Sequence, residues 1–148
     1  MKVIFLILMT WSGLVYADFT RESETGIVTD TQSGLEWQDN NVSRSVTWQE
    51  AIEMCEALSV GEKEDWRLPN INELVSLVDD GRVNPAMDEV FQQSKSNNYW
   101  SSTTLYFAPE NANKSTMAWY VDFYRGVQEF QPKKSSILNY VRCVRGGV

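Results

Sequence analysis

Residues 47–58 read TWQEAIEMCEAL, and this stretch decides the fold predicted for the chain. Thr47 with Glu50 three positions later is a capping box, in which the threonine side chain accepts a backbone N–H bond and the glutamate reaches back to the cap. The apolar residues behind the box recur at helical spacing, namely Trp48, Ala51, Ile52, Cys55 and Leu58. The stretch therefore predicts a helix that carries Cys55 on its buried face.

A second helix start lies a short distance downstream. Asn70 is followed three positions later by Glu73, which repeats the cap, and this helix is expected to end near Gly81. Between the two helices stands a block that we interpret as architecture: Trp66, Arg67, Leu68 and Pro69. Arg67 is expected to hold a buried carboxylate or loop carbonyls, because a guanidinium can make several hydrogen bonds at once.

Much of the remaining chain has the pattern of strands. Extended segments are predicted at residues 26–30, 34–38, 99–104, 118–123 and 140–145. The first two flank a short polar connection and predict a β-hairpin. Two long polar connections, residues 105–117 and 124–139, separate the last three segments, and such loops commonly carry binding residues. The predicted fold class is α+β, with two helices packed on short antiparallel sheets and long loops between them.

The N-terminus has the pattern of a secretory signal. Lys2 precedes an apolar run, and Val15 and Ala17 occupy the −3 and −1 positions of a signal-peptidase site. The apolar run falls short of the ~20 residues that span a bilayer. We therefore predict a signal peptide at residues 1–17, one domain at residues 18–148, export to the periplasm or the cell surface, and no transmembrane segment after cleavage.

The chain contains two cysteines, Cys55 and Cys143. An even count in an exported protein is typical of a disulfide. Closing a loop of about 90 residues would remove roughly 4–5 kcal/mol of unfolded-state entropy. The alternative is a pair of separate reactive thiols, but the chain has no histidine to activate them. We expect the two cysteines to form one disulfide.

The composition excludes several kinds of chemistry. The chain contains no histidine, which removes the commonest general base and metal ligand. No Gly-rich phosphate loop and no Cys-x-x-Cys pair is present. The formal net charge of −7 argues against a nucleic-acid partner, and weakly against polyanions unless a local basic patch defeats the average. We expect no cofactor and no enzymatic activity.

Acidic residues raise one further hypothesis about metals. Residues 79–81 (Asp-Asp-Gly) together with residues 88–89 (Asp-Glu) could bind a cation through carboxylates. Their spacing differs from that of an EF-hand loop, so a solvated acidic loop is favoured and no metal site is predicted. Two facing carboxylates could also cleave a glycoside, but the sequence alone does not show such a pair.

Aromatic residues cluster in the second half of the chain. Trp100, Trp119 and Phe123 are expected in the core, because large aromatic side chains anchor small cores. Exposed tyrosines beside carboxylates and amides would offer a ligand both flat surfaces and polar groups. This combination defines the candidate ligand residues, which are Tyr106, Glu110, Asn111, Asn113, Tyr120, Asp122 and Tyr124. The alternative, that these aromatics cover the second sheet, stays open.

Six blocks of the sequence stand in the order seen in a known family: residues 26–37, 47–55, 66–74, 99–103, 118–123 and 141–146. Together they resemble a family of bacterial exported domains that includes the C-terminal adhesive domain of the Legionella collagen-like protein. The resemblance covers nearly all of the predicted domain. The chain has no collagen-like Gly-x-y repeat, so trimerisation through a collagen stalk is not implied.

That family is similar in turn to the C-type lectin-like fold, in which a disulfide ties the first helix to the last strand. The resemblance therefore implies this fold, with Cys55 and Cys143 in the two corresponding elements. The calcium-binding tripeptides of sugar-binding lectins are absent from the sequence. In Gln131-Pro132-Lys133, a lysine stands where a ligand carboxylate would be needed, so calcium-dependent sugar binding is not implied.

Three functions are compatible with these observations. The function that we expect is an exported, non-catalytic binding or adhesion module that recognises a glycan or a protein through its long loops. The second is a structural or accessory subunit of a cell-envelope assembly. The third is an enzyme with an unrecognised carboxylate site.

Overall fold

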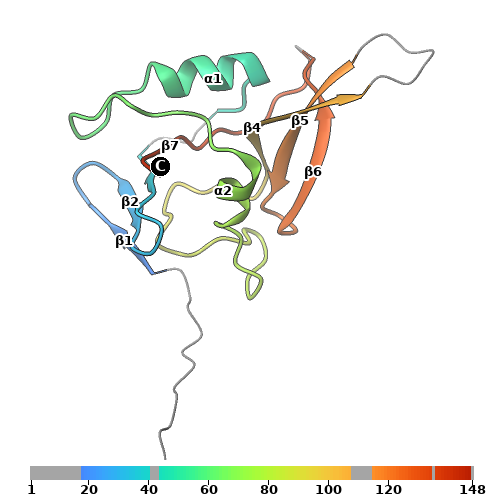
Figure 1. Ribbon diagram of the computed structural model, residues 1–148. Helices are drawn as coiled ribbons and strands as arrows, with labels where there is room; N and C mark the ends of the chain where they lie inside the picture. The colour runs from blue at the N-terminus through green and yellow to red at the C-terminus, as the bar shows by residue number, and fades with distance from the viewer. Residues whose placement is uncertain (1–17, 41–43, 108–114, 135, 148) are drawn as a thin grey trace, which may run out of the picture.

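The structure is a computed structural model, which describes residues 18–40, 44–107, 115–134 and 136–147. It contains two antiparallel sheets and two short helices (Figure 1). The elements in chain order are β1 (Phe19–Arg21), β2 (Ile27–Asp30), β3 (Glu36–Gln38), α1 (Trp48–Glu56), α2 (Ile71–Val75), β4 (Asn98–Phe107), β5 (Ser115–Asp122), β6 (Val127–Pro132) and β7 (Val144–Arg145). The strand order is β1-β2-β3-β7 in the first sheet and β4-β5-β6 in the second. This arrangement confirms the α+β class.

Both helices begin at the capping boxes that the sequence predicts. In α1 the Thr47 side chain accepts the Glu50 N–H, and the Glu50 carboxylate accepts the Thr47 N–H at 2.9 Å. Asn70 and Glu73 make the same reciprocal pair at the start of α2. The prediction that the second helix ends near Gly81 is wrong. It ends at its cap Ser76, whose hydroxyl donates to the Glu73 carbonyl at 2.7 Å and so competes with the helical bonds.

A disulfide joins Cys55 of α1 to Cys143, next to β7. The prediction of one bridge is therefore confirmed. Both cysteines are buried in a cluster that also contains Ala51 and Trp100. The covalent link holds α1 against the closing segment of the chain, which lies far from it in sequence.

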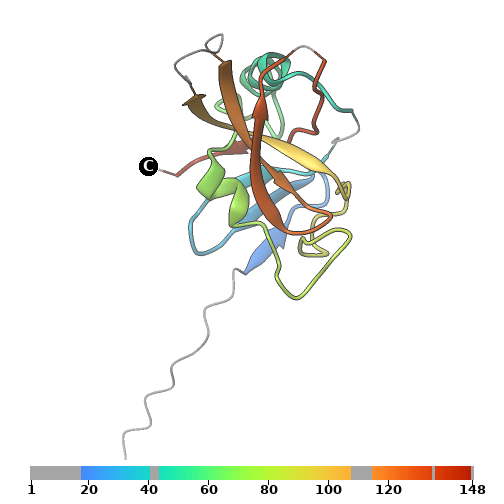
Figure 2. The ribbon, with the colours of Figure 1, turned by 90° about the vertical axis from the view of Figure 1, so that its right-hand side faces the viewer.

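The second sheet is buried on both of its faces at its centre. Trp100 is fully buried in the cluster that includes α1, whereas its neighbour Tyr99 is fully buried in the cluster that includes Leu74 of α2. Adjacent residues of a strand point to opposite faces, so α1 and α2 cover opposite faces of this sheet. The two helices accordingly lie apart from each other in both ribbon views (Figures 1 and 2).

The structure confirms two of the three predicted core residues, since Trp100 and Phe123 are fully buried, and corrects the third, Trp119. Trp100 is fully buried, and its indole Nε1 donates to the Val46 carbonyl at 2.9 Å. Trp119 is only half-buried, and its ring lies edge-on to the exposed ring of Phe130 with the ring centroids 5.2 Å apart. The buried neighbour of Trp119 on the other face is Tyr120, because that face of β5 packs under α1.

The two long polar connections are in part strands. β4 continues to Phe107 and β5 starts at Ser115, inside the segment predicted as a loop over residues 105–117. β6 occupies residues 127–132 of the other predicted loop. Its composition is polar because it is the edge of the sheet, and its strand conformation comes from pairing with β5. The predicted strand 140–145 is reduced to β7, with an isolated bridge between Tyr140 and Tyr99.

The block between the helices is architectural, as predicted. Trp66 is buried and donates its Nε1 to the Lys63 carbonyl at 3.0 Å, and the buried Pro69 accepts the Ser102 N–H at 2.7 Å through its carbonyl. Arg67 makes two bonds of 2.7 and 2.8 Å to the Glu73 carboxylate and one of 3.1 Å to a loop carbonyl at position 146. A carboxylate and a loop carbonyl were both expected as partners of that guanidinium, but the carboxylate is half-buried rather than buried as predicted.

A buried ion pair that the sequence analysis missed ties the first sheet to the segment before β4. Asp39 and Arg142 are both fully buried, and the Arg142 Nη1 donates to the Asp39 Oδ1 at 2.7 Å. The second oxygen of Asp39 accepts a hydrogen bond of 2.7 Å from the Arg21 guanidinium. The carboxylate also accepts hydrogen bonds from the backbone N–H groups of Gln92 and Gln93. This Asp39–Arg142 core fixes where the segment before β4 lies.

Within the part of the chain that the structure describes, no helix combines the length and the apolar character that a membrane crossing requires.

Candidate functional site

The predicted ligand residues do not form one exposed surface within the described residues. Glu110, Asn111 and Asn113 lie outside the described residues. Tyr106 belongs to β4, but its side chain is also outside what the structure describes. Tyr124 is exposed, at 56 % of its possible surface.

The expectation that Tyr120 offers an exposed ring is wrong. Its side chain packs in the cluster under α1, and only 8 % of the residue is exposed. The hydroxyl donates to the Glu129 carboxylate at 2.5 Å. Burial, together with this bond to Glu129, raises the pKa of Tyr120 to about 12. Tyr120 therefore closes the sheet rather than facing a ligand.

Asp122 is also buried, against expectation, and serves the turn between β5 and β6. Its carboxylate accepts the Tyr124 N–H at 2.8 Å and the Arg125 Nε at 2.6 Å. These bonds stabilise the turn that starts directly after β5, and they leave 7 % of Asp122 exposed. The carboxylate is therefore used inside the protein.

A basic hollow opens where α1 begins, beside the ends of β5 and β6. Its volume is about 310 Å³, and its lining residues come from three separate segments: Thr47, Trp48, Gln49, Thr116, Lys133 and Lys134. We call it the lysine hollow. None of the seven predicted ligand residues is among these six, although Thr116, Lys133 and Lys134 fall within the two predicted connections. The strand pairing of β5 with β6 places Thr116 and Lys133 together, because the Lys133 N–H donates to the Thr116 carbonyl at 3.1 Å.

Trp48 forms the aromatic wall of the lysine hollow. Its indole Nε1 donates to the Ser101 carbonyl at 2.9 Å, which fixes the orientation of the ring. The Lys133 Nζ lies 3.9 Å from the ring centroid, within the range of a cation–π interaction. The ring thus holds one ammonium group in place at the hollow while leaving its hydrogen-bond donors available.

The electrostatic character of the lysine hollow differs from that of the whole chain. The chain carries a net charge of −7, but among the described residues no acidic side chain lines the hollow, whereas two lysines do. The backbone N–H groups of Trp48 and Gln49 belong to the first turn of α1, where a helix has no internal acceptor for them. Glu50 already occupies this turn, and bonds from the Thr47 backbone and hydroxyl lower its pKa. The attraction for an anion therefore comes chiefly from the lysines.

One sequence signal could have pointed to the lysine hollow. Lys133-Lys134 is a pair of adjacent basic residues in an acidic chain, and it is the kind of local patch that overrides the average charge. Trp48 gave no separate signal, because its helical spacing also fits a core residue. The approach of Trp48 to Lys133 depends on the tertiary fold, so the sequence pattern does not contain it.

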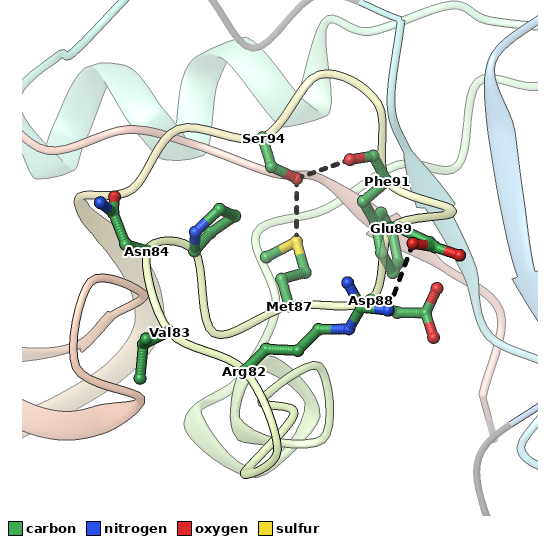
Figure 3. Close-up of a pocket in the computed structure, with 9 residues that line it drawn as sticks. Arg82, Val83, Asn84, Met87, Asp88, Glu89, Phe91 and Ser94 are labelled. Carbon is green, nitrogen blue, oxygen red and sulfur yellow. Dashed lines mark hydrogen bonds and ion pairs between the residues drawn. The ribbon is translucent and has the colours of Figure 1, made fainter.

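Two other hollows lie around residues 76–94, and they are acidic. Their volumes are about 400 and 640 Å³, and both are lined by Asp88. Arg82 makes ion pairs with Asp79 at 3.1 Å and with Glu89 at 3.3 Å, and Figure 3 shows Arg82 extended toward Glu89. Two of the carboxylates thus share one guanidinium, which offsets their charge in part. No group of three or more metal-ligating side chains occurs among the described residues, so we do not place the candidate site here.

Comparison with protein families gives a match to this chain. The family model described as the Lcl C-terminal domain matches residues 26–145. No curated protein matches the chain significantly. No solved structure does so either.

Proposed function

Since this chain belongs to the Lcl C-terminal domain family, we propose that it is an exported, non-catalytic binding module that recognises an acidic glycan at the lysine hollow. The observation that supports this most is the pair Lys133 and Lys134 beside the ring of Trp48. Both lysines lack an acidic partner among the described residues, unlike Arg21 and Arg145 of the first sheet and Lys63 beside it, which are paired.

The composition of the hollow suits a sugar that carries sulfate or carboxylate groups. Ammonium groups attract anions, whereas Thr116 supplies a hydroxyl that a sugar hydroxyl can bond. The Thr47 hydroxyl and the Gln49 amide also line the hollow, but they already donate to Glu50 and Glu53. Trp48 positions the Lys133 ammonium, which lies over its ring, and so contributes to anion binding through that lysine. Because two exposed or half-exposed lysines dominate the attraction, binding is expected to weaken as salt rises.

The non-catalytic character and the export are part of the same proposal. The absence of histidine from the whole chain supports a binding role over acid–base or metal catalysis. The pattern of residues 1–17 and the disulfide support an oxidising, extracytoplasmic location. The tie between the first helix and the closing segment also supports a C-type lectin-like fold for this domain.

A pair of polymers that differ in charge alone provides the test. Dextran sulfate and unmodified dextran are immobilised, and binding of the oxidised protein is measured over a range of salt, with calcium and with chelator. We expect capture by dextran sulfate, none by dextran, a loss of binding with rising salt, and no dependence on calcium. A glycan array then ranks natural acidic sugars.

Matched variants assign the binding to the hollow. Lys133→Gln with Lys134→Gln should reduce capture at least about tenfold, because both charges are lost. Lys95→Gln removes an exposed lysine outside the hollow and should leave capture unchanged. Equal binding by the double variant would refute the assignment to the hollow. If the folded protein binds none of the acidic glycans, the proposed ligand would change from a glycan to a protein of the envelope.

A further inference from the structure

One end of the second sheet carries apolar side chains that the core does not cover. On the face toward α2, Val121 of β5 is fully buried in the cluster that includes Leu74. Trp119 and Met117, the preceding residues of β5 on the same face, are only half-buried. Among the described residues, neither of them belongs to a core cluster or packs against one. The end of the sheet where β4 ends and β5 begins extends past α2 (Figure 1), so this helix leaves part of the face open.

Strand pairing brings these uncovered side chains together. Trp119 pairs with Phe130 of β6, and their ring centroids are 5.2 Å apart. In the next row, Met117 lies between its two partners, Leu105 of β4 and Pro132 of β6. Phe130 is 48 % exposed, and the other four residues are half-buried. We call these five residues the aromatic face, and none of them is charged.

Trp119 differs from the other described tryptophans in its indole N–H. Trp48, Trp66 and Trp100 donate this group to backbone carbonyls at 2.9–3.0 Å, and Trp37 is fully buried. The Trp119 Nε1 donates to no group in the described part of the chain and is not buried. The aromatic face therefore offers ring surface together with a hydrogen-bond donor that the fold does not use.

The size of the aromatic face limits the kind of partner that fits it. A large aromatic side chain has about 150–250 Å² of surface, so Phe130 leaves roughly 100 Å² exposed, and the five residues together leave roughly 200–400 Å². A stable protein–protein interface buries about 800 Å² on each partner. Two copies of a chain with a net charge of −7 also repel each other. The aromatic face is therefore too small for a stable protein contact, a second copy included.

The shape of the aromatic face narrows the choice further. A small apolar ligand is normally enclosed in a cleft of about 300–1,000 Å³, but none of the five residues lines the lysine hollow or either acidic hollow. An open face suits a ligand that has one apolar side and stays hydrated on the other. The pyranose ring of a sugar has this character, because its C–H groups form an apolar side and its hydroxyls point outward.

We propose that the aromatic face is a subsite for an uncharged sugar ring, which stacks on Phe130 and Trp119 and accepts the Trp119 indole N–H through a hydroxyl. A contact of this size is weak, so the dissociation constant for a single uncharged oligosaccharide is expected at roughly 1–10 mM. Binding of this strength is not retained on an immobilised polymer, which is consistent with the expectation that unmodified dextran captures none of the protein.

The aromatic face and the lysine hollow lie on opposite faces at the same end of the second sheet. Pro132 and Met117 adjoin Lys133 and Thr116 in the chain, and adjacent residues of a strand point to opposite faces. β6 is the outer strand of this sheet, so a glycan chain that passes around it would contact both sites. Such a glycan, with charged and uncharged rings, should bind at least about tenfold more tightly than one confined to the hollow. This consequence rests on the proposed function, whereas the sugar subsite itself does not.

The subsite is tested with cellotetraose, an uncharged oligosaccharide of β-linked glucose rings. In ¹H–¹⁵N spectra of the oxidised protein, the Trp119 indole signal should shift and approach saturation at millimolar sugar, whereas the Trp48 signal should stay in place. The variant Lys133→Gln with Lys134→Gln should give the same shift, because the subsite does not use the lysines. The result is therefore independent of whether the hollow binds acidic glycans.

Matched variants assign the shift to the aromatic face. Phe130→Ser removes an exposed ring and should weaken cellotetraose binding at least about tenfold, whereas Phe130→Tyr keeps a ring and should bind like the wild type. Tyr124→Ser removes an exposed ring from the turn at the other end of the sheet and should have no effect.

Two results would overturn the proposal. The first is a Trp119 signal that stays in place up to about 50 mM cellotetraose, or that shifts equally in the wild type and in Phe130→Ser. The second is a Trp119 signal that ignores the sugar and instead shifts with protein concentration, which would identify the aromatic face as a contact between copies.

Discussion

Charged side chains occupy two contrasting places in this molecule. In the Asp39–Arg142 core, both side chains are fully buried, and the carboxylate is bonded by two guanidinium groups and two backbone N–H groups. In the lysine hollow, Lys133 and Lys134 have no acidic partner among the described residues and face a concave surface. The contrast teaches that charges with internal partners hold the fold, whereas charges without them are available to a ligand. Substitutions should therefore change stability in the first place and binding in the second.

The largest effect is expected from removing the covalent link beside the core. Replacing Cys55 and Cys143 by alanine frees a loop that spans most of the domain, and should lower the free energy of unfolding by roughly 4–5 kcal/mol. Urea denaturation of the oxidised wild type and of the double variant measures the difference. A loss below about 1 kcal/mol would mean that the link contributes little to holding the closing segment.

The second-largest effect on stability is expected from breaking the buried pair Asp39–Arg142. Arg142→Leu leaves the Asp39 carboxylate in the interior with only its remaining partners, and breaking a buried pair in this way costs about 3–5 kcal/mol. Arg44→Leu is the matched control, because Arg44 is exposed and should change stability by less than about 0.5 kcal/mol. If both variants unfold at the same urea concentration, the Asp39–Arg142 core would not stabilise the fold.

Low pH should destabilise the fold by protonating Glu73. Burial opposes ionisation of this carboxyl, but hydrogen bonds from Arg67 and from the Asn70 N–H outweigh burial and lower its pKa below 4.5. The carboxylate therefore stabilises the fold above pH 4.5, and this contribution is lost as the pH falls through the lowered value. The pair is partly exposed, so the contribution should not exceed about 1 kcal/mol.

Thermal unfolding as a function of pH measures that contribution. The midpoint of the wild type should fall below pH 4.5, and Glu73→Gln should fall less steeply over the same range, because it has no proton to take up at this site. Parallel curves for the two proteins would show that other groups govern the acid response.

The smallest effect on stability is expected in the lysine hollow itself. Lys133→Gln with Lys134→Gln should change the free energy of unfolding by less than about 0.5 kcal/mol, although the same variant is expected to lose binding. Urea denaturation gives the value. A loss above about 2 kcal/mol would place the lysines with the structural charges and remove the contrast between the two regions.

The parts of the fold that the sequence predicted depend on signals that are local in the chain. Both capping boxes lie within four residues, and the first hairpin depends on adjacent segments. Cys55 was placed on the buried side of its helix by spacing alone. These features depend only on residues close to one another in the sequence, so a sequence pattern is sufficient to predict them.

The parts that were missed depend on tertiary contacts. β6 has a polar composition and becomes a strand because β5 supplies its partners. Tyr120 was expected to be exposed, and it is buried because α1 covers its face of the sheet. Arg142 lies in a run of four buried residues, 141–144, where alternation would have placed it outside. The contact between the Trp48 ring and the Lys133 ammonium also depends on the tertiary fold.

The indole N–H signals of the tryptophans test most directly whether ligand binds at the lysine hollow. In ¹H–¹⁵N spectra recorded during titration with a short dextran sulfate, we expect the Trp48 signal to move, because its ring lines the hollow. The signal of Trp37, which is fully buried in the other cluster, should stay in place. Binding that leaves Trp48 unmoved and shifts backbone signals of residues 79–94 would contradict the account and place the ligand at the acidic hollows.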